Sequence, residues 1–325
     1  MPPSSERDED GRTDAQTHGR TEAPGDGRTD LPAEARTVTP APRPWTPRAV
    51  TPLLLPGPVA IVRPRNLVLA VAGTAIGGFL ALDRFWIPAA LWWAMASAAC
   101  LGAAGNAAND LFDVEADRVN RPLRPLVAGT ISRGGATLEA GIAGGLGLVA
   151  AWWVGPTVFA LGLAALVVML VYSPLLKSRG LVGNIAVATV ASLPLVFGAT
   201  AVGDWRAGLV PSGLAAFLHL AREVVKDIED VPGDLAVGRP TLPISYGAGA
   251  GYATAALVLL VFVPVSLVPW VAGWYGWRYG VLVTLLDVGV LALVSRLGAR
   301  RHDGVRTGLK AAMALGLLAL LWERI

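Results

Sequence analysis

Long apolar segments separated by short polar loops fill the chain from Arg63 to its end, and this alternation constrains the fold more than any other feature. A helix needs roughly 20 residues to cross a bilayer. The chain is 54% hydrophobic and 16% charged, whereas a soluble domain has about 25% charged residues. We therefore expect an all-α polytopic membrane protein with nine transmembrane helices. The predicted spans are 66–82, 86–107, 136–154, 157–176, 181–202, 207–225, 246–271, 279–295 and 307–322.

The basic residues predict which ends of the spans face the cytoplasm. With nine spans and the N-terminus inside, fourteen Lys and Arg residues fall in inside loops or the adjoining helix ends, and four fall outside. This positive-inside bias predicts an integral plasma membrane protein whose C-terminus lies outside. The inside residues are Arg118, Arg121, Arg124, Arg133, Lys177, Arg179, Arg222, Lys226, Arg239, Arg296, Arg300, Arg301, Arg306 and Lys310.

The N-terminal region differs from the rest of the chain. Residues 1–58 contain a GRT repeat of period eight and a Pro-rich stretch, and residues 1–50 carry nine Asp or Glu and seven Arg. No apolar run there could form a core or the hydrophobic part of a signal peptide. We predict a disordered cytoplasmic tail over 1–58 and a membrane domain over 59–325. The single cysteine, Cys100, excludes a disulfide framework within the chain.

Nine of the fifteen acidic residues after position 50 lie in two short segments, 110–117 and 223–234. Each segment belongs to a quartet of polar residues with spacings of 4, 3 and 4, which places a quartet within about 60° of arc on one helix face. Pro122, Pro125 and Pro232 predict that each helix breaks near its quartet. The first quartet is Asn106, Asp110, Asp113 and Asp117. The second quartet is Glu223, Asp227, Asp230 and Asp234.

Like charges at these spacings repel one another unless cations neutralise them. Oxygen ligands without His or Cys suit Mg²⁺, which proteins hold through one or two carboxylates plus substrate phosphates. The quartets therefore predict two or three Mg²⁺ ions around a diphosphate. A solvated loop and a cation-transport path are alternatives, although transport carboxylates usually lie near the bilayer centre. The predicted metal ligands are Asp110, Asp113, Asp117, Asp227, Asp230 and Asp234.

Further polar side chains near the quartets are candidate contacts of the diphosphate. Arg and Lys bind phosphate oxygens through charge-assisted hydrogen bonds. Helix capping is the alternative role for the asparagines 106 and 109, and lipid-headgroup contact is the alternative for Arg121 and Arg124. His219 lies one helical turn before Glu223 and is a candidate contact of an acceptor, with simple packing as the alternative. The diphosphate candidates are Asn106, Asn109, Arg121, Arg124, Asn184, Arg222, Lys226 and Arg239.

Three segments resemble motifs of the UbiA superfamily of intramembrane prenyltransferases. NDLFDVEAD, residues 109–117, has the N-D-x-x-D-x-x-x-D form of the first motif, and DIEDVPGD, residues 227–234, resembles the second. YSPLLK, residues 172–177, resembles the Tyr/Lys signature between them. The longer segment REVVKDIEDVPGD most resembles the branch that contains digeranylgeranylglyceryl phosphate synthase, an enzyme of ether-lipid assembly.

The resemblance implies a nine-helix bundle with a central cavity, a cytoplasmic cap over the active site and a lateral opening for a lipid tail. It implies Mg²⁺-dependent transfer of a polyprenyl group from an isoprenoid diphosphate, with release of diphosphate. The implied acceptor is an aromatic or quinone precursor or a prenylated glycerol phosphate. Tyr172 and Lys177 are the catalytic candidates. Lys177 would contact the diphosphate, with a topology signal as the alternative, and Tyr172 would contact the diphosphate or the carbocation, with simple packing as the alternative. A membrane terpene cyclase of the same superfamily and a non-enzymatic carrier are the alternatives, and no nucleic-acid partner is expected.

Overall fold

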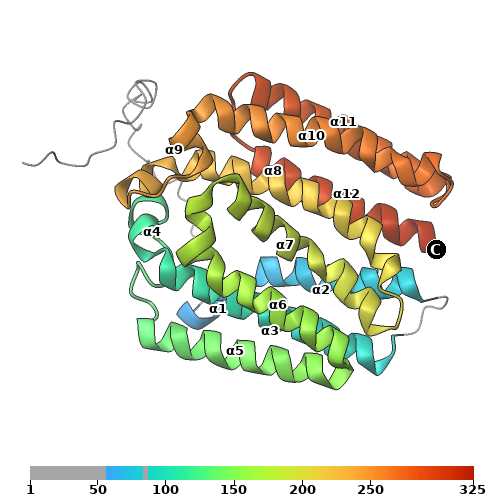
Figure 1. Ribbon diagram of the computed structural model, residues 1–325, viewed down its shortest axis with the longest axis horizontal. Helices are drawn as coiled ribbons and strands as arrows, with labels where there is room; N and C mark the ends of the chain where they lie inside the picture. Colours follow the sequence, from blue (N-terminus) through green and yellow to red (C-terminus); the bar gives the residue numbers. More distant parts are fainter. Residues whose placement is uncertain (1–55, 83–86) are drawn as a thin grey trace, which may run out of the picture.

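The computed structural model describes residues 56–82 and 87–325, so residues 1–55 of the predicted tail lie outside the described residues. Within the described part, every element is a helix. The long helices run side by side along one direction, and the connecting segments lie at the two ends of the bundle (Figure 1). This is the all-α architecture that the sequence predicts.

The described residues contain nine helices of sixteen residues or more, and these correspond one to one to the nine predicted spans. Eight helical segments of the described chain are long and apolar enough to cross a membrane. The remaining long helix, α3, has 24 residues and ends in the polar sequence NAANDLF. The nine helices are α2 (Pro64–Ala81), α3 (Ala89–Phe112), α5 (Arg133–Val154), α6 (Pro156–Val171), α7 (Leu181–Ala201), α8 (Arg206–Ala236), α10 (Ala248–Val271), α11 (Trp277–Gly298) and α12 (Val305–Arg324).

Short helices cover one end of the bundle. α4 (Val114–Asn120) follows α3, and α9 (Leu242–Tyr246) follows α8, both on the left in Figure 1. A π-helical turn, Tyr172–Leu176, and a 3-10 turn, Lys177–Arg179, connect α6 to α7. A further short helix, α1 (Gly57–Ile61), precedes α2. The short helices α4 and α9 form the cap that the family resemblance implies.

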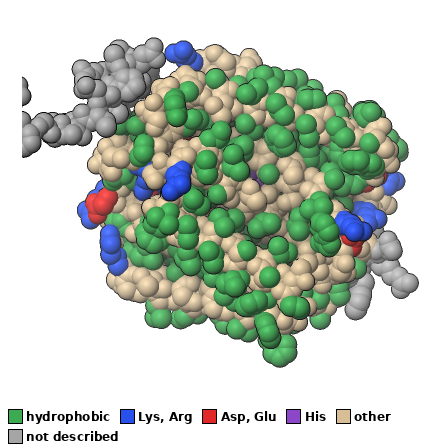
Figure 2. All heavy atoms as spheres, viewed as in Figure 1, with side chains coloured by type: hydrophobic (Ala, Val, Ile, Leu, Met, Phe, Trp, Pro, Cys, Tyr) green, Lys and Arg blue, Asp and Glu red, His purple; other side chains and the backbone are tan. Residues whose placement is uncertain are grey.

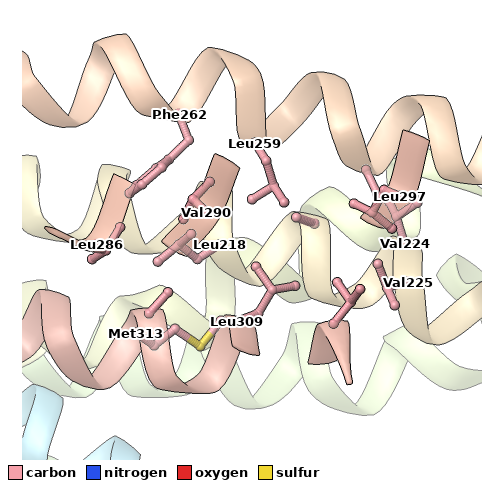
Figure 3. Packing of buried hydrophobic residues seen from close by; sticks show 14 of the residues in the cluster. Leu218, Val224, Val225, Leu259, Phe262, Leu286, Val290, Leu297, Leu309 and Met313 are labelled. Atoms are coloured by element: carbon pink, nitrogen blue, oxygen red, sulfur yellow. The ribbon is translucent and has the colours of Figure 1, made fainter. Parts of the chain in front are cut away.

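Helix α8 organises the second half of the molecule, because it contacts α7, α10 and α12. Side chains from α8, α10, α11 and α12 interlock in one buried cluster, in which Leu259, Val290 and Leu309 have no exposed surface (Figure 3). Lipid tails are as apolar as these side chains, so close van der Waals packing stabilises the contact between helices in a bilayer.

Two glycines allow α2 and α7 to approach closely. A Cβ atom at Gly198 would lie 1.8 Å from the carbonyl oxygen of Thr74, and one at Gly77 would lie 2.0 Å from that of Leu195. Any larger residue at either position would push the two backbones apart. Small residues at contacts between helices are typical of membrane bundles.

The outer surface suits contact with lipid. Hydrophobic side chains are spread over the whole face drawn in Figure 2, and the charged side chains lie mainly toward its left and right parts. At the end of the bundle opposite α4, tryptophans at the ends of α5, α10 and α11 are exposed, which matches the aromatic belt of a membrane protein. They are Trp152, Trp153, Trp270, Trp274 and Trp277.

Candidate active site

The first acidic quartet lies across a break between two helices. α3 ends at Phe112, and Asp113 connects it to α4 with a backbone conformation outside the helical region, φ −95° and ψ 6°. The first quartet therefore has a break that the prolines did not predict, at Asp113 inside the quartet. The break predicted from Pro122 also occurs, because α4 ends at Asn120. Asn106 and Asp110 extend from α3, whereas Asp117 extends from α4.

The second quartet lies within one continuous helix. The prediction that this helix breaks at Pro232 is wrong, because α8 runs on to Ala236 with Pro232 inside it. The predicted span 207–225 ended too early, since charged residues after Val225 lower the hydropathy without ending the helix. The 31 residues of α8 extend about 46 Å, against a hydrocarbon core of about 30 Å. Its acidic end can therefore lie outside the lipid core.

Two arginines join the quartets. Arg121, which follows α4, pairs with Asp230 of the second quartet. Arg239, which follows α8, has its Nη2 atom 3.1 Å from Oδ1 of Asp113 in the first quartet. Each arginine therefore crosses from its own motif to the other. The two motifs, more than a hundred residues apart in the chain, form a single polar site.

An asparagine that the sequence did not indicate holds the two motifs together. The Asn120 side-chain amide donates to the backbone carbonyl of Asp230 at 2.9 Å, and the backbone N–H of Gly233 donates to Oδ1 of Asn120 at 3.0 Å. A Cβ atom at Gly233 would lie 2.5 Å from the carbonyl oxygen of Ala116. The contact between α4 and α8 therefore depends on a glycine and an asparagine, and neither residue type by itself predicts such a role.

All six predicted metal-ligand aspartates are buried, with 1–3% of their surface exposed. Burial of a carboxylate is costly unless a cation or hydrogen-bond donor compensates it. Basic side chains supply most of this compensation. The ion pairs are Asp110 with Arg63 and Arg124, Asp113 with Lys177 and Arg239, Asp117 with Arg121 and Arg124, Asp230 with Arg121, and Asp234 with Arg239.

Asp227 differs from the other five aspartates. Its Oδ2 accepts a hydrogen bond from the side-chain amide of Asn184 at 2.9 Å. Among the described residues, no Lys or Arg nitrogen lies within 4 Å of the Asp227 carboxylate. Asn184, predicted as a diphosphate contact, therefore orients a predicted metal ligand in this structure.

Burial and neighbouring charges act in opposite directions on the carboxylates outside the spans. Burial raises the pKa of Asp113, but the charges of Lys177 and Arg239 together lower it by more than burial raises it. The net pKa therefore lies below its usual value. For Asp117, burial raises the pKa more than Arg124 and Arg121 lower it, so the net pKa lies above its usual value. The basic side chains thus keep Asp113 ionised, while Asp117 is compensated less completely.

A cavity of about 390 Å³ lies beside this polar site. Most of its wall is apolar and comes from α2, α3, α6, α7, α8 and α12. The Tyr172 hydroxyl and Nδ1 of His219 are buried without a hydrogen-bond partner among the described residues, and both side chains line the cavity. The predicted site residues on its wall are Asn106, Asn109, Arg121, Arg124, Tyr172, Arg222 and Lys226, together with His219.

The two predicted asparagines of α3 have local partners. The Asn106 amide donates to the carbonyl oxygen of Val62 at 2.8 Å, which fixes the entry into α2. The Asn109 amide donates to Oδ2 of Asp113 at 3.0 Å, and its own oxygen accepts from the Ser173 hydroxyl at 3.1 Å. Asn109 therefore connects the first quartet to the turn that carries Tyr172.

The predicted basic residues of α8 share one carboxylate. Arg222 Nη1 lies 2.7 Å and Lys226 Nζ lies 2.9 Å from the oxygens of Glu223, which is 5% exposed. Lys177 is 6% exposed, and its Nζ lies 2.7 Å from Oδ2 of Asp113. Lys177 therefore lies behind the first quartet rather than on the cavity wall.

The donor atoms fit Mg²⁺ only together with further ligands. No three His, Cys, Asp or Glu side chains of the described chain are grouped as a ready metal cage. However, the available donors are carboxylate oxygens from two motifs, and Oδ2 of Asp234 is buried without a partner in this part of the chain. Mg²⁺ usually takes one or two carboxylates and completes its octahedron with substrate phosphates and water. The residues therefore fit a metal that arrives with a phosphorylated substrate.

The family model described as the UbiA prenyltransferase family matches residues 68–318. The chain belongs to this family. Its UbiA domain is similar to the digeranylgeranylglyceryl phosphate synthase of Methanopyrus kandleri, with 36% identity over 267 residues that cover 80% of this chain and 96% of that relative. The synthase of Halobacterium salinarum is 40% identical over 230 residues, which cover 70% of this chain and 82% of the relative.

Solved structures share the fold of this UbiA family member. One that concerns digeranylgeranylglyceryl phosphate synthase in membranes has a TM-score of 0.68 at 25% identity, and the match covers 83% of this chain and 98% of that one. A UbiA homologue from Archaeoglobus fulgidus, bound to DMAPP and Mg²⁺, has a TM-score of 0.65 at 19% identity, with 82% and 98% covered. The predicted family, enzyme class and all-α membrane fold are thereby confirmed.

Arg63 is a site residue that the sequence analysis did not include. It pairs with Asp110 from a left-handed backbone conformation, φ 54°, at the start of α2. The signal for it was present, because the residue before a proline is kept out of the helical region and so marks a turn. The described chain has four Arg-Pro dipeptides, and the arginine of each pairs with a quartet aspartate. They are Arg63, Arg121, Arg124 and Arg239.

Proposed function

We propose that this UbiA family member transfers a geranylgeranyl group from its diphosphate to a prenylated glycerol phosphate and releases diphosphate. The observation that carries the reaction class is the meeting of two carboxylate quartets beside a largely apolar cavity. The choice of acceptor is supported by the curated relatives, which are named digeranylgeranylglyceryl phosphate synthase and are matched over 82–96% of their length. Their name describes the product of such a transfer.

Mg²⁺ is the proposed cofactor, in two or three ions. The six quartet aspartates would hold it, and Asp227 is the aspartate that can do so without giving up an ion pair in the described chain. When bound, Mg²⁺ supplies Lewis-acid stabilisation of the charge that develops on the leaving diphosphate. The A. fulgidus homologue bound to DMAPP and Mg²⁺ supports this assignment through the shared fold.

Basic residues that pair with the buried carboxylates are the proposed diphosphate ligands. Arg121, Arg124 and Lys226 line the cavity, and their donors can pass from carboxylate to phosphate oxygens when substrate binds. The Tyr172 hydroxyl, buried without a partner in the described chain, can donate to the same oxygens. Lys177 and Arg239 do not line the cavity, and we propose that their ion pairs hold the Asp113 carboxylate in position.

The rest of the cavity has the character that a carbocation needs. Its largely apolar wall excludes water, which would otherwise capture the allylic cation after the C1–O bond breaks. The acceptor hydroxyl then forms the new C–O bond at C1 and loses its proton. His219 lines the cavity with Nδ1 free of any partner in the described chain, so we place the acceptor beside it.

The test is an end-product assay with purified protein in lipid nanodiscs, Mg²⁺ and geranylgeranyl diphosphate. With geranylgeranylglyceryl phosphate as acceptor, we expect the doubly prenylated glycerol phosphate and an equal amount of diphosphate, identified by mass spectrometry. If the enzyme instead prenylates a phenolic acid, the proposed acceptor is wrong. A cyclised hydrocarbon or alcohol without acceptor would identify a terpene cyclase, and no diphosphate release would indicate a carrier.

We also propose that the polar site opens to the cytoplasm, as the basic loops indicate. Leu123 follows α4 and Trp205 lies at the other end of α7, and both are exposed, at 66% and 48%. In a Cys100→Ala background, Leu123→Cys should react with an impermeant thiol reagent only from the cytoplasmic side. Trp205→Cys should react only from outside. Reversed labelling would invert the proposed topology.

A further inference from the structure

A group of basic side chains lies beside the cavity apart from the six aspartates. Arg222 of α8 and Arg306 and Lys310 of α12 line the cavity. Arg306 and Lys310 are four residues apart and so share a face of α12. Arg65 of α2 is close enough that its charge, like those of Arg222 and Arg306, acts on Lys310. These four residues are called the α8–α12 basic cluster below.

The cluster has more positive charge than its surroundings neutralise. Arg222 pairs with Glu223, which also binds Lys226, and Arg306 pairs with Glu229. Among the described residues, no carboxylate lies within ion-pair distance of Lys310 or Arg65. Mutually repelling cations at a cavity wall are stabilised when an anion binds between them.

Two buried donors of the cluster have no partner in the described chain. They are the Nε atoms of Arg222 and Arg306, and both side chains line the cavity. A buried donor without an acceptor destabilises the protein, since it has lost its hydrogen bonds to water. An oxyanion that offers several acceptor oxygens, such as a phosphate, would satisfy both.

The cluster meets the acidic segment of α8 through the glutamates 223 and 229, and through none of the quartet aspartates of the described chain. The pair between Arg306 and Glu229 places the start of α12 beside the acidic end of α8. Arg222 precedes Glu229 by seven residues, or about 10 Å along α8, and Lys310 lies one turn into α12. The neighbouring cavity wall contains Leu218 and Met313. A ligand held here therefore needs an anionic head and an apolar body.

We infer that Arg222, Arg306 and Lys310 bind the phosphate monoester of the acceptor, while its prenyl chain lies along the apolar wall of the same cavity. The inference rests on the proposed function, because it concerns the acceptor of that reaction. It assigns Arg222 to the acceptor rather than to the diphosphate. A prenylated glycerol phosphate carries the required anionic head and apolar body, whereas a neutral prenylglycerol lacks the anion.

Lys310→Ala tests the inference, because Lys310 is exposed and has no ion-pair partner among the described residues that its loss would leave buried. Steady-state kinetics should give a KM for geranylgeranylglyceryl phosphate about tenfold higher, since one charge-assisted hydrogen bond to phosphate is lost. The kcat and the KM for geranylgeranyl diphosphate should stay near wild type. Lys310→Arg should restore most of the affinity. Arg301→Ala, an exposed charge in the loop before α12, is the matched control and should change neither KM.

A neutral acceptor separates the phosphate contact from a general defect. Wild type should use geranylgeranylglycerol poorly, and Lys310→Ala should leave that KM unchanged. Equal rises in KM for both acceptors, or a rise in KM for the diphosphate, would overturn the inference. Kinetics in nanodiscs with and without phosphatidylglycerol identify the source of the phosphate. An effect that vanishes without phosphatidylglycerol would mean that the cluster binds bilayer lipid, and this too would overturn the inference.

Failure of the proposed function remains distinguishable from failure of this site. If wild type prenylates only a phenolic acid, the proposed function fails, and inhibition by hexadecyl phosphate then tests the cluster directly. Weaker inhibition of Lys310→Ala than of wild type and Arg301→Ala would support an anion site for a lipid phosphate. Equal inhibition of all three proteins would eliminate that site.

Discussion

The two acidic quartets have the same 4-3-4 spacing but different backbones. The first is divided between α3 and α4 by the bend at Asp113, whereas the second lies in the unbroken helix α8, which passes through Pro232. All six aspartates are nevertheless buried at one site. The comparison teaches that spacing defines the face on which the carboxylates lie, while the neighbouring elements decide whether the helix continues.

The quartets also differ in how their charge is balanced. Both Asp110 and Asp117 of the first quartet pair with Arg124, and each has a second arginine. Asp227 of the second accepts a hydrogen bond from the neutral amide of Asn184 and has no ion-pair partner in the described chain. Metal binding at Asp227 would therefore require no ion pair to break, whereas metal binding at Asp110 displaces arginines.

The largest expected effect is on turnover when either quartet loses a charge. Asp110→Asn and Asp227→Asn should each reduce kcat by about a hundredfold or more, because each removes stabilisation of the same leaving diphosphate. The double variant should be little worse than the single ones, since both groups serve one step. Rates of diphosphate release with saturating Mg²⁺ measure this. Fully multiplicative losses would mean that the quartets act in separate steps.

The same two variants should differ in stability. Asp110→Asn removes ion pairs with Arg63 and Arg124 and should lower the free energy of unfolding by about 1–3 kcal/mol. Asp227→Asn keeps the shape and breaks no ion pair of the described chain, so its Tm without Mg²⁺ should stay within a few degrees of wild type. Thermal unfolding in nanodiscs checks this contrast. A lower Tm for Asp227→Asn than for Asp110→Asn would contradict it.

A smaller loss is expected when the contact between the quartets is weakened. Asn120→Ala removes both hydrogen bonds to α8, so kcat should fall about tenfold as the quartets lose alignment. Asn120→Asp keeps the acceptor for the Gly233 N–H but cannot donate to the carbonyl of Asp230. Its kcat should therefore lie between those of wild type and Asn120→Ala. Unchanged kcat with a lower Tm would show that Asn120 supports only the fold.

Substitution of the glutamates 115 and 229, which lie beside the quartet aspartates, should change kcat and the acceptor KM by less than about threefold. Glu115 has a side chain 62% exposed that pairs only with exposed Arg118 in the described chain, so Glu115→Ala should leave kcat unchanged. Glu229 is 27% exposed and pairs with Arg306 at the basic cluster. Glu229→Gln should keep kcat and lower the acceptor KM slightly, because Arg306 is then free for phosphate. If either glutamate proved as essential for turnover as the aspartates, the metal-binding carboxylates would not lie on a single helix face as the quartets predict.

The smallest effect is expected from the tail. Its composition gives it no packed core, so deletion of residues 1–50 should leave turnover near that of wild type. Initial rates of the truncated and full chains in the same nanodiscs measure this. A loss of more than about tenfold would mean that the tail takes part in the site or binds a partner.

The sequence by itself determined the helical membrane fold, the nine long helices and the pair of acidic faces. These are local properties, because hydropathy and helical spacing depend only on neighbouring residues. For the same reason, helical spacing alone separates Glu115 from the face that carries Asp113 and Asp117. The Arg-Pro dipeptides also carry a local signal, because the residue before a proline is kept out of the helix, and they mark the four arginines of the described chain that pair with quartet aspartates.

The tertiary structure alone decided where the quartets meet and which cations serve them. Whether α8 continues through Pro232 depends on its contacts with α4, α10 and α12, and these residues are distant in the chain. The hydrogen bond from Asn120 to Asp230 joins segments about 110 residues apart. The basic cluster likewise brings Arg222 to the same cavity as Arg306 and Lys310, more than about 80 residues away in the chain. Charge compensation in a buried site depends on distances of a few ångströms between such segments. Only the packed arrangement of the helices determines those distances.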